Sequence, residues 1–439
     1  MKACVLSCMK KIKTKIKSFL GYDTLIWLKI RKTFLTDNWK AIKVNRKIRQ
    51  NVQRSKQKLL QNQKLKVLFI VQFPEMWSSL KSLYAAFVED SRYEVLLYAV
   101  PLRTGTTGEC DNKAFRFFVK DGYPVINAYA EGAFREIEED CDFIFVQRPY
   151  DQFMPEEYRL SALSTKGLVC YVPYSGRMTH GIHINIEFNS ALLCNAFAIF
   201  ADCDESFRYV KSWYCNHFVC RERQVFNIGF PRYDLVCHFF RSNVTFESKQ
   251  SCESFLWLPR WTLESLSDAS NFFLYIDFLL DFFRDNPTLS LIIRPHPLMF
   301  SNFLEKGAMT QEELKTMMDT IDSLPNVSID ENADYLISFS DCNALIADPT
   351  SLLREFCYTG KPVIFCGKYT ALSKLTDVAQ KIYDTFYIVN SVSEMEDAMT
   401  ALVDGRDSKL VDRQSVYKEL LKMTSGDSKR FTDELYRCL

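Results

Sequence analysis

Short, mainly apolar runs alternate with helix-like stretches through most of this chain, and no other feature limits its fold as much. In the first half, the apolar runs are at residues 67–73, 93–100, 143–146, 168–172 and 196–201. The helix-like stretches there are at residues 74–90, 155–163 and 205–213. Strands that are apolar on both faces and alternate with helices are typical of a parallel sheet covered by helices. The pattern therefore predicts an α/β domain over residues 67–234.

A second set of the same kind follows residue 234. Its apolar runs are at residues 255–258, 289–293, 327–329, 344–347 and 362–366. The length of 439 residues exceeds the roughly 250–300 at which a single hydrophobic core stops growing. We therefore expect an α/β protein with two Rossmann-like domains, residues 67–234 and 235–439, facing a cleft. Ligands of such sheets bind beyond the carboxyl ends of the strands.

The first 66 residues differ from the rest of the chain in charge. They hold 19 Lys and Arg against only Asp23 and Asp37, whereas the remainder holds 36 basic and 52 acidic residues. Apolar side chains are interleaved with these charges: Phe19, Leu20, Trp27, Phe34, Leu35 and Trp39. No run reaches the roughly 7–15 apolar residues of a signal peptide or the roughly 18 of a membrane span.

Cationic and apolar side chains in this mixture suit helices that lie on an anionic membrane surface, where each Lys or Arg contributes about 1 kcal/mol. We therefore predict that residues 1–66 form a basic amphipathic extension and hold a peripheral protein at the cytoplasmic face of the cell membrane. Fifteen scattered cysteines without a Cys-x-x-Cys spacing indicate reduced thiols, as in cytosolic proteins. The alternatives are a helical extension that packs on the body, and attraction to nucleic acid. We expect no nucleic-acid partner.

The segment 294–297, Arg-Pro-His-Pro, directly follows an apolar run, where an open α/β sheet places ligands. Arg294 offers a bidentate fork to phosphate oxygens. His296 can donate a hydrogen bond or a proton to a leaving phosphate. The two prolines restrain the turn. The alternative is a structural turn with a surface histidine.

A second motif, Asp-Pro-Thr-Ser-Leu-Leu-Arg-Glu at 348–355, follows another apolar run and opens a helix. The hydroxyls of Thr350 and Ser351, with the free N–H groups of the first helical turn, can form an anion site. Glu355 lies one turn further along, where it can accept hydrogen bonds from a ribose or another polyol. The alternative is plain helix capping by residues such as Asp348.

Two segments of the first half carry further candidates. Segment 229–234 contains Gly and Pro and is expected to form a turn, in which Arg232 can face the cleft. The alternative is a hinge turn with a surface arginine. Segment 167–189 runs from a strand into a polar loop that contains His180 and His183. Either histidine can act as the base for an acceptor hydroxyl, and the alternative is an ordinary loop residue. Residues 147–150 end the preceding strand and are expected to line the same cleft.

Several enzyme classes lack their signatures in this chain. It contains no G-x-x-x-x-G-K-[ST], G-x-G-x-x-G, G-x-S-x-G or H-E-x-x-H motif. This absence disfavours P-loop enzymes, NAD dehydrogenases, α/β-hydrolases and zincins. Only five histidines are present and none belongs to a Cys/His cluster, so we expect no metal site. We also expect no cofactor.

Taken in order, several segments resemble the CDP-glycerol glycerophosphotransferase family, the teichoic-acid-type enzymes and their capsule-cluster relatives. They are GFPRYD at 229–234, LPRWT at 258–262, LIIRPHP at 291–297, ADPTSLLREF at 347–356 and GKPVIF at 360–365. The resemblance covers about residues 67–405. It implies a two-domain GT-B-type fold and metal-independent transfer of glycerol phosphate from CDP-glycerol to a hydroxyl of a lipid-linked acceptor, with release of CMP.

The resemblance also implies roles for individual residues. The Arg-Pro-His at 294–296 matches the motif that contacts the donor diphosphate, and Asp348 with Ser351 matches a phosphate-binding Asp-x-x-Ser turn. The expected nucleotide-donor residues are Arg232, Arg294, His296, Asp348, Thr350, Ser351 and Glu355. The expected catalytic residues are His180, His183 and His296.

Two motifs depart from the family pattern. The family's His-Gly-Thr-Pro is absent, with only a His-Gly pair at 180–181, and its Pro-Thr-Trp-Arg is reordered to Pro-Arg-Trp-Thr at 259–262. We expect a CDP-glycerol or similar CDP-polyol donor, and a lipid-linked glycan or polyol-phosphate acceptor. The alternatives are a GT-B glycosyltransferase that uses a nucleotide sugar and a catalytically inactive membrane-bound scaffold.

Overall fold

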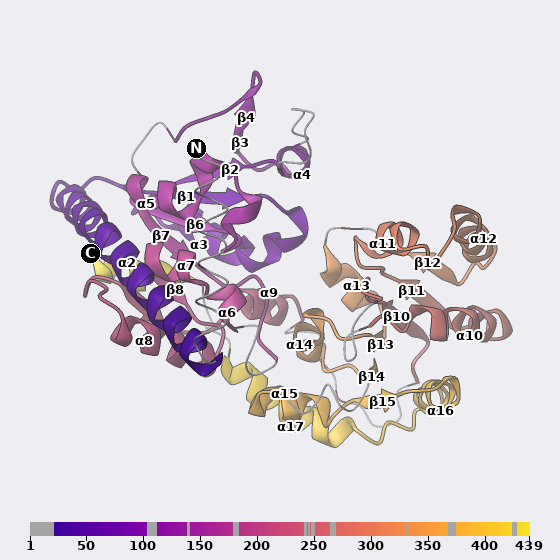
Figure 1. The fold of residues 1–439 in the computed structure, drawn as a ribbon. Coiled ribbons are helices and arrows are strands. Elements are labelled where there is room, and N and C mark those ends of the chain that lie inside the picture. The colour runs from indigo at the N-terminus through magenta and orange to yellow at the C-terminus, as the bar shows by residue number, and fades with distance from the viewer. Residues whose placement is uncertain are drawn as a thin grey trace, which may run out of the picture.

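The computed structural model contains two units, each built on a parallel sheet (Figure 1). It describes residues 22–102, 112–137, 141–178, 184–240, 244, 246, 251–263, 269–330, 332, 334–367, 375–423 and 428–439. The α/β class and the parallel sheets agree with the alternation of apolar runs in the sequence.

The first sheet has the strand order β3-β2-β1-β6-β7-β8-β9. Its strands are β1 (Leu65–Val71), β2 (Tyr93–Ala99), β3 (Val125–Asn127), β6 (Phe143–Val146), β7 (Leu168–Tyr171), β8 (Ala196–Phe200) and β9 (Gln224–Phe226). A separate antiparallel pair consists of β4 (Tyr129–Ala130) and β5 (Ala133–Phe134). The helices of this part of the chain are α2 (Tyr22–Leu60), η1 (Pro74–Ser79), α3 (Lys81–Glu89), α4 (Lys113–Lys120), η2 (Asp151–Phe153), η3 (Glu156–Tyr158), α5 (Leu160–Lys166), α6 (Ile184–Glu187), α7 (Ser190–Asn195), α8 (Asp204–Asn216) and α9 (Pro231–Phe240).

The second sheet has the strand order β12-β11-β10-β13-β14-β15. Its strands are β10 (Ser254–Leu258), β11 (Ser290–Ile293), β12 (Val327–Ile329), β13 (Ala344–Ala347), β14 (Val363–Cys366) and β15 (Tyr387–Val389). The helices from here to the end of the chain are α10 (Phe272–Asp285), α11 (Met299–Glu305), α12 (Gln311–Asp322), α13 (Tyr335–Asp341), α14 (Leu352–Phe356), η4 (Cys357–Thr359), α15 (Asp377–Tyr383), α16 (Val392–Val403), α17 (Leu410–Leu420), η6 (Leu421–Met423) and α18 (Lys429–Cys438).

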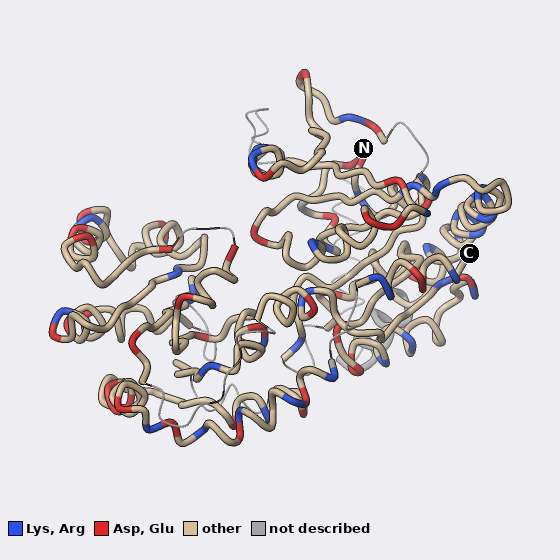
Figure 2. Tube along the Cα trace, turned by 180° about the vertical axis from the view of Figure 1, so that it is seen from behind, with Lys and Arg blue, Asp and Glu red and all other residues tan. Residues whose placement is uncertain are grey.

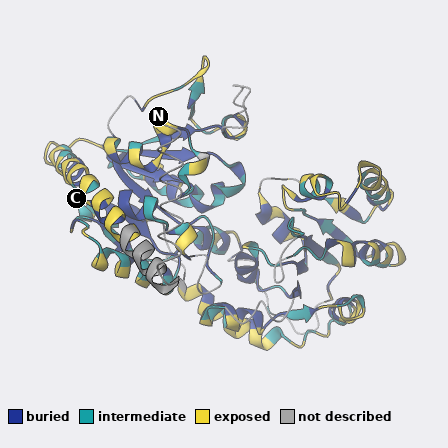
Figure 3. Cartoon of the chain, in the orientation of Figure 1, coloured by how far each residue is buried: buried dark blue, intermediate teal, exposed yellow. Residues whose placement is uncertain are grey.

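Strand β1 shows why these sequences form buried sheets. Its residues Val67 and Phe69 enter the core on one face of the sheet, while Leu68 and Ile70 enter the core on the other. Successive side chains of a strand point to opposite faces, so an apolar run needs a cover on both sides. Figure 3 shows the strands as the buried interior of both units. The core that contains Val67 continues into the second unit, where it includes Leu256.

Helix α2 packs on the first unit, as in the alternative of a helical extension that packs on the body. The carboxylate of buried Asp142 accepts hydrogen bonds from the Ser55 hydroxyl and the Lys58 ammonium, both at 2.7 Å. The Arg54 guanidinium donates to the carbonyl oxygens of Cys141 and Lys166, at 2.7 and 3.1 Å. A buried carboxylate is stable only with such partners. The carboxyl-terminal half of α2 is therefore part of the first unit.

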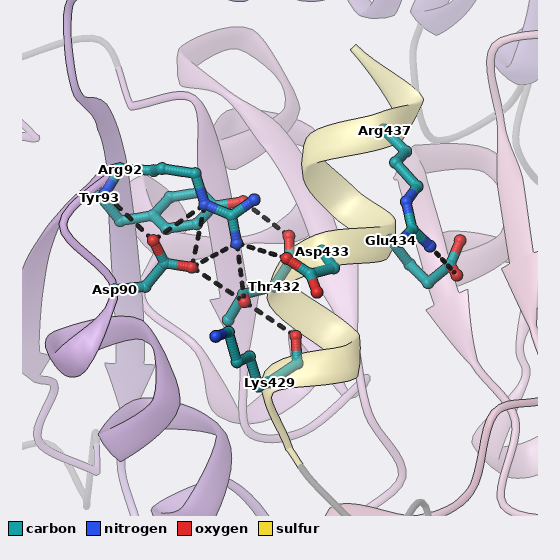
Figure 4. A network of polar contacts seen from close by, with 8 residues as sticks. All are labelled: Asp90, Arg92, Tyr93, Lys429, Thr432, Asp433, Glu434 and Arg437. Carbon is teal, nitrogen blue, oxygen red and sulfur yellow. Dashed lines mark hydrogen bonds and ion pairs between the residues drawn. The ribbon is translucent and has the colours of Figure 1, made fainter.

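The last helix, α18, also lies on the first unit, although it belongs to the range 235–439 that was expected to form the second domain (Figure 4). The Tyr93 hydroxyl donates to the Thr432 carbonyl oxygen at 2.7 Å. The Arg92 guanidinium bridges Asp90 and Asp433, at 2.5 Å to each. A single boundary near residue 234 therefore does not separate the two units, because the chain returns to the first one.

Two general features concern the described residues only. None of their helices is both long and apolar enough to cross a membrane. None of the cysteines among them forms a disulfide.

Candidate active site

Three loops that lie far apart in the sequence meet at the carboxyl edge of the second sheet. They follow β10, β11 and β13, and they are adjacent because β11 and β13 both pair with β10. The backbone N–H of Arg260 donates to Asp348 Oδ2 at 2.7 Å, and its guanidinium donates to the Pro349 carbonyl oxygen at 2.6 Å. The Trp261 ring stacks on the His296 imidazole with 5.7 Å between centroids. The reordered Pro-Arg-Trp-Thr segment thus joins the two motifs that the sequence singled out.

His296 lies exposed at this edge of the sheet. Its Nδ1 accepts a hydrogen bond from the backbone N–H of Leu298 at 3.2 Å, so the neutral ring carries its proton on Nε2. Desolvation by the protein atoms around the ring, and then the positive charge of Arg260, lower the pKa of His296 to about 4. The carboxylate of Glu75, from the first unit, acts on this pKa in the opposite direction. Near pH 7 His296 is therefore a neutral hydrogen-bond donor.

Arg294 lies at the same edge and is held by an acidic neighbour. Its Nη1 contacts Asp330 Oδ2 at 2.6 Å, and its Nη2 donates to the Asn332 carbonyl oxygen at 2.5 Å. The side chain keeps 15% of its surface exposed. A phosphate that binds here would share the guanidinium with Asp330.

Asp348 organises the loops, whereas Thr350 and Ser351 lie nearer the surface. Asp348 is buried and accepts hydrogen bonds from Arg260 and from the backbone and side-chain amides of Asn271. Burial raises its pKa. Ser351 is exposed at the start of α14, and the Thr350 hydroxyl accepts a weak hydrogen bond of 3.4 Å from the Leu352 N–H. Ser351 is thus exposed and Thr350 half-buried, whereas the Asp348 carboxylate is buried.

Arg232 and Glu355 are brought together, but in the interior where the two units join. Arg232 Nε lies 2.7 Å from Glu355 Oε2, and both side chains are almost completely buried. The Tyr335 hydroxyl also donates to Glu355, and Arg232 donates to the Tyr174 carbonyl oxygen. Burial raises the pKa of Glu355, and the charge of Arg232 opposes this rise. Because Glu355 is buried in this arrangement, it has no exposed surface for the ribose contact that the sequence suggested.

The two histidines predicted as bases, His180 and His183, lie outside the described residues. The loop that precedes them forms a pocket of about 310 Å³ at the carboxyl end of β7. It is lined by Tyr150, Tyr174, Ser175, Gly176, Arg177, Met178, Ile186 and Glu187. Tyr150 comes from the segment 147–150 that was expected to share this region, and its hydroxyl lies 3.2 Å from that of Tyr174.

The sequence analysis did not single out Glu187, the carboxylate of this pocket. Its side chain is 13% exposed and accepts a hydrogen bond from the Tyr171 hydroxyl at 2.8 Å. Arg177 Nη2 lies 3.3 Å from its other oxygen. Burial, followed by the nearby charge of Asp202, raises the pKa of Glu187 to about 7. The available signal was a single carboxylate at the end of a loop of uncharged polar and basic residues.

The pocket loop is also bonded to the second unit. The Arg177 carbonyl oxygen accepts a hydrogen bond from Arg354 at 3.0 Å, and the Met178 carbonyl oxygen accepts one from the Thr376 N–H at 3.0 Å. Arg354 lies on α14, three residues after Ser351. The pocket of the first unit is therefore linked to the loop that follows β13. Within the described parts of the chain, no group of three or more His, Cys, Asp or Glu side chains is arranged to hold a metal ion.

Comparison with known proteins gives matches in structure alone. No protein-family profile and no curated protein sequence matches the chain. The UDP-GlcNAc 2-epimerase from Methanocaldococcus jannaschii superposes with a TM-score of 0.52 and 13% identity, over 85% of this chain and 100% of that one. The UDP-GlcNAc 2-epimerase from Neisseria meningitidis, solved with UDP-GlcNAc bound, gives 0.51 and 12%, over 84% and 99%. The wall teichoic acid polymerase TagF gives 0.48 and 13%, over 92% and 98%.

The two epimerase likenesses, with the two parallel sheets, define the class of protein. The chain has a GT-B fold, with two Rossmann-like units, as the sequence predicted. At 12 and 13% identity the likeness is one of fold. The activity must therefore be argued from the residues of this chain.

Proposed function

We propose that this protein transfers glycerol phosphate, or a related polyol phosphate, from a CDP-linked donor to a hydroxyl of a lipid-linked or polysaccharide acceptor in cell-surface polymer synthesis. The observation that carries the proposal is the meeting of the Arg-Pro-His-Pro and Asp-Pro-Thr-Ser loops at one sheet edge. A GT-B fold binds ligands at this edge, and the bound UDP-GlcNAc of the Neisseria epimerase is a nucleotide-linked ligand. The resemblance of the motifs to CDP-glycerol enzymes supports the choice of donor.

In this proposal the acceptor oxygen attacks the phosphorus that bears the glycerol. The new oxygen–phosphorus bond forms as the bond to CMP breaks. The neutral His296 donates a hydrogen bond from Nε2 to the departing phosphate, while Arg294 and the hydroxyls of Thr350 and Ser351 stabilise the charge that develops there. Phosphoryl transfer of this kind depends on positioning and electrostatic stabilisation. His180 and His183 remain predicted bases.

A second candidate is a GT-B glycosyltransferase that uses a nucleotide sugar. The observations that favour it are the UDP-GlcNAc ligand of a protein with this fold and the missing His-Gly-Thr-Pro motif. It would use the same phosphate-binding side chains and differ only in the group that is transferred. An inactive scaffold is the third possibility, and it predicts no donor binding at all.

Calorimetric titration of the purified protein with CDP-glycerol, CDP-ribitol and UDP- and CMP-sugars tests the proposal. We expect micromolar binding of a CDP-polyol and at least tenfold weaker binding to Arg294→Ala, because the guanidinium contacts the phosphates. Arg284→Ala is the matched control, since Arg284 is an exposed arginine on α10 of the same unit. Preference for a UDP-sugar would favour the glycosyltransferase. Absence of binding to every nucleotide would favour the scaffold.

We also propose that α2 places the enzyme at an anionic membrane on the cytoplasmic side. The face opposite the docked side of the helix exposes Leu35, Trp39 and Ile42, with 62, 60 and 52% of their surfaces accessible. The Lys43 ammonium lies 3.3 Å above the Trp39 ring. Lys and Arg recur along the helix (Figure 2). Exposed apolar side chains flanked by cations suit the interface of an anionic bilayer.

A further inference from the structure

The pocket at the carboxyl end of β7 contains a carboxylate to which nothing above assigns a role. We infer that Glu187 is the group that takes the proton from the acceptor hydroxyl during transfer. The inference rests on the proposed transferase function and deepens it by naming the acceptor side of the site. The inference replaces His180 and His183 as the predicted base, since the family's His-Gly-Thr-Pro motif is missing.

The charges around Glu187 explain why it can exchange a proton. Arg177 is the cation that contacts it, and this arginine also faces Asp202, whose carboxylate accepts from the Arg177 backbone N–H at 2.6 Å. One arginine residue therefore contacts both carboxylates, Glu187 through its guanidinium and Asp202 through its backbone N–H. The titratable and charged groups that face Glu187 or pack beside it are Tyr150, Tyr171, Tyr174, Arg177, Asp202 and Tyr209.

The two carboxylates do not have the same surroundings. Asp202 accepts hydrogen bonds from the Arg177 N–H at 2.6 Å and from the Ser206 hydroxyl at 2.6 Å. Glu187 has one hydroxyl donor and a guanidinium contact of 3.3 Å, and it lines the pocket. Burial and the nearby charge of Asp202 raise the pKa of Glu187 to about 7, so its carboxylate can take up a proton near neutral pH. A general base works best when its pKa lies near the operating pH.

The position of the pocket suits an acceptor site. Its loop is bonded to the second unit through the carbonyl oxygens of Arg177 and Met178. One of these bonds leads to Arg354 on the helix that begins beside Ser351. An acceptor in the pocket would therefore approach the donor from the first unit, while the nucleotide phosphates lie at the edge of the second sheet.

The proposed step is balanced in atoms and charge. The acceptor oxygen forms a bond to the donor phosphorus, and the bond between that phosphorus and the CMP oxygen breaks. The acceptor proton passes to the ionised Glu187 carboxylate, and CMP leaves with the electron pair of the broken bond. Glu187 then releases the proton to solvent through the open pocket.

The first test compares Glu187→Gln with Glu157→Gln in the intact protein. Glutamine keeps the size of the side chain and can still accept from Tyr171, whereas Glu157 is an exposed residue of η3 in the same unit. We expect turnover of Glu187→Gln to fall about 10²–10⁴-fold, the usual contribution of acid–base catalysis, with donor affinity unchanged. The acidic limb of the wild-type pH–rate profile should disappear. Wild-type turnover in Glu187→Gln would overturn the inference.

The second test needs no substrate. A carboxyl group that titrates near pH 7 in infrared difference spectra, present in the wild type and Glu157→Gln but lost in Glu187→Gln, would support the inference. A Glu187 that titrates near 4.3, like an ordinary glutamate, would overturn it. Donor binding separates the two proposals. An inactive Glu187→Gln that still binds CDP-glycerol supports both, whereas a wild type that neither binds donor nor transfers it overturns the proposed function and this inference with it.

Discussion

His296 shows how the surroundings of one side chain set its chemistry. A histidine in water is half protonated near pH 6.5, but this ring lies against Trp261 and near Arg260. Desolvation and the positive neighbour both disfavour the imidazolium, so the ring donates a hydrogen bond from Nε2 without carrying charge. This state suits a group that steadies a departing phosphate over a wide range of pH.

We predict that His296→Ala lowers turnover by about 10²–10⁴-fold while the protein stays folded. The change removes the proposed donor to the leaving phosphate from an exposed position, where truncation costs little packing. Steady-state transfer assays with circular dichroism melts provide the measurement. His238→Ala is the control, because His238 is an exposed histidine on α9. Near-wild-type turnover of His296→Ala would contradict the assigned role.

The same histidine predicts a pH dependence of stability. Its folded pKa of about 4 lies below the ordinary value of about 6.5, so the unfolded chain binds more protons between these two values. The contribution of His296 to the free energy of unfolding therefore decreases as the pH falls from about 6.5 to about 4. Urea titrations across this range should show a weaker pH dependence in His296→Ala. An imidazole that titrates near 6.5 in NMR spectra would contradict this prediction.

At the scale of elements, α2 has two faces with different surroundings. Ala41, Ile48 and Val52 are buried against the first unit. Leu35, Trp39 and Ile42 point away from it and remain exposed. A helix with a second apolar face, surrounded by cations, has surface left to bind something else.

We predict that replacing Leu35, Trp39 and Ile42 together by Ser lowers flotation with phosphatidylserine vesicles at least about tenfold, because the apolar contact with the interface is removed. Phosphatidylcholine vesicles should float little of the wild type, since they lack the negative charge. Val411→Ser is the matched control, because Val411 is 75% exposed on α17. Equal flotation of the triple variant and the wild type would refute this face as the membrane contact.

At the scale of the whole molecule, the junction of the two units depends on buried charge. Arg232 from α9 pairs with Glu355 from α14, and Arg354 reaches back to the Arg177 carbonyl oxygen. The Arg232 and Glu355 side chains are both buried, with 6% and 0% of their surfaces exposed. Helix α18 also returns to the first unit, where Asp433 contacts Arg92 (Figure 4). These contacts connect the two units.

We predict that Glu355→Gln lowers the free energy of unfolding by about 3–5 kcal/mol, because it leaves the charge of Arg232 buried without its partner. Denaturant titrations measure the effect, with Glu305→Gln, an exposed site on α11, as control. The double change Arg232→Met with Glu355→Leu should recover much of the loss, since it removes both charges. A Glu355→Gln protein of wild-type stability but weakened donor binding would instead support the ribose contact that the sequence suggested.

The sequence alone specified the class of fold and the edge of the sheet that bears the candidate site. Apolar runs such as 67–73 and 344–347 dictate strands through local pattern, and the residues after a parallel strand must lie at its carboxyl edge. The same argument places Arg294, His296, Thr350 and Ser351 at this edge, after β11 and β13.

The tertiary structure alone decided which distant groups meet. Arg232 and Glu355 were both expected near the nucleotide, but packing turned them toward each other at the junction. The chemistry of the Glu187 carboxylate depends on its contacts with Tyr171 and Arg177 and on the nearby charge of Asp202. Burial and electrostatic coupling depend on contacts between segments far apart in the chain. A local pattern contains no information about such contacts.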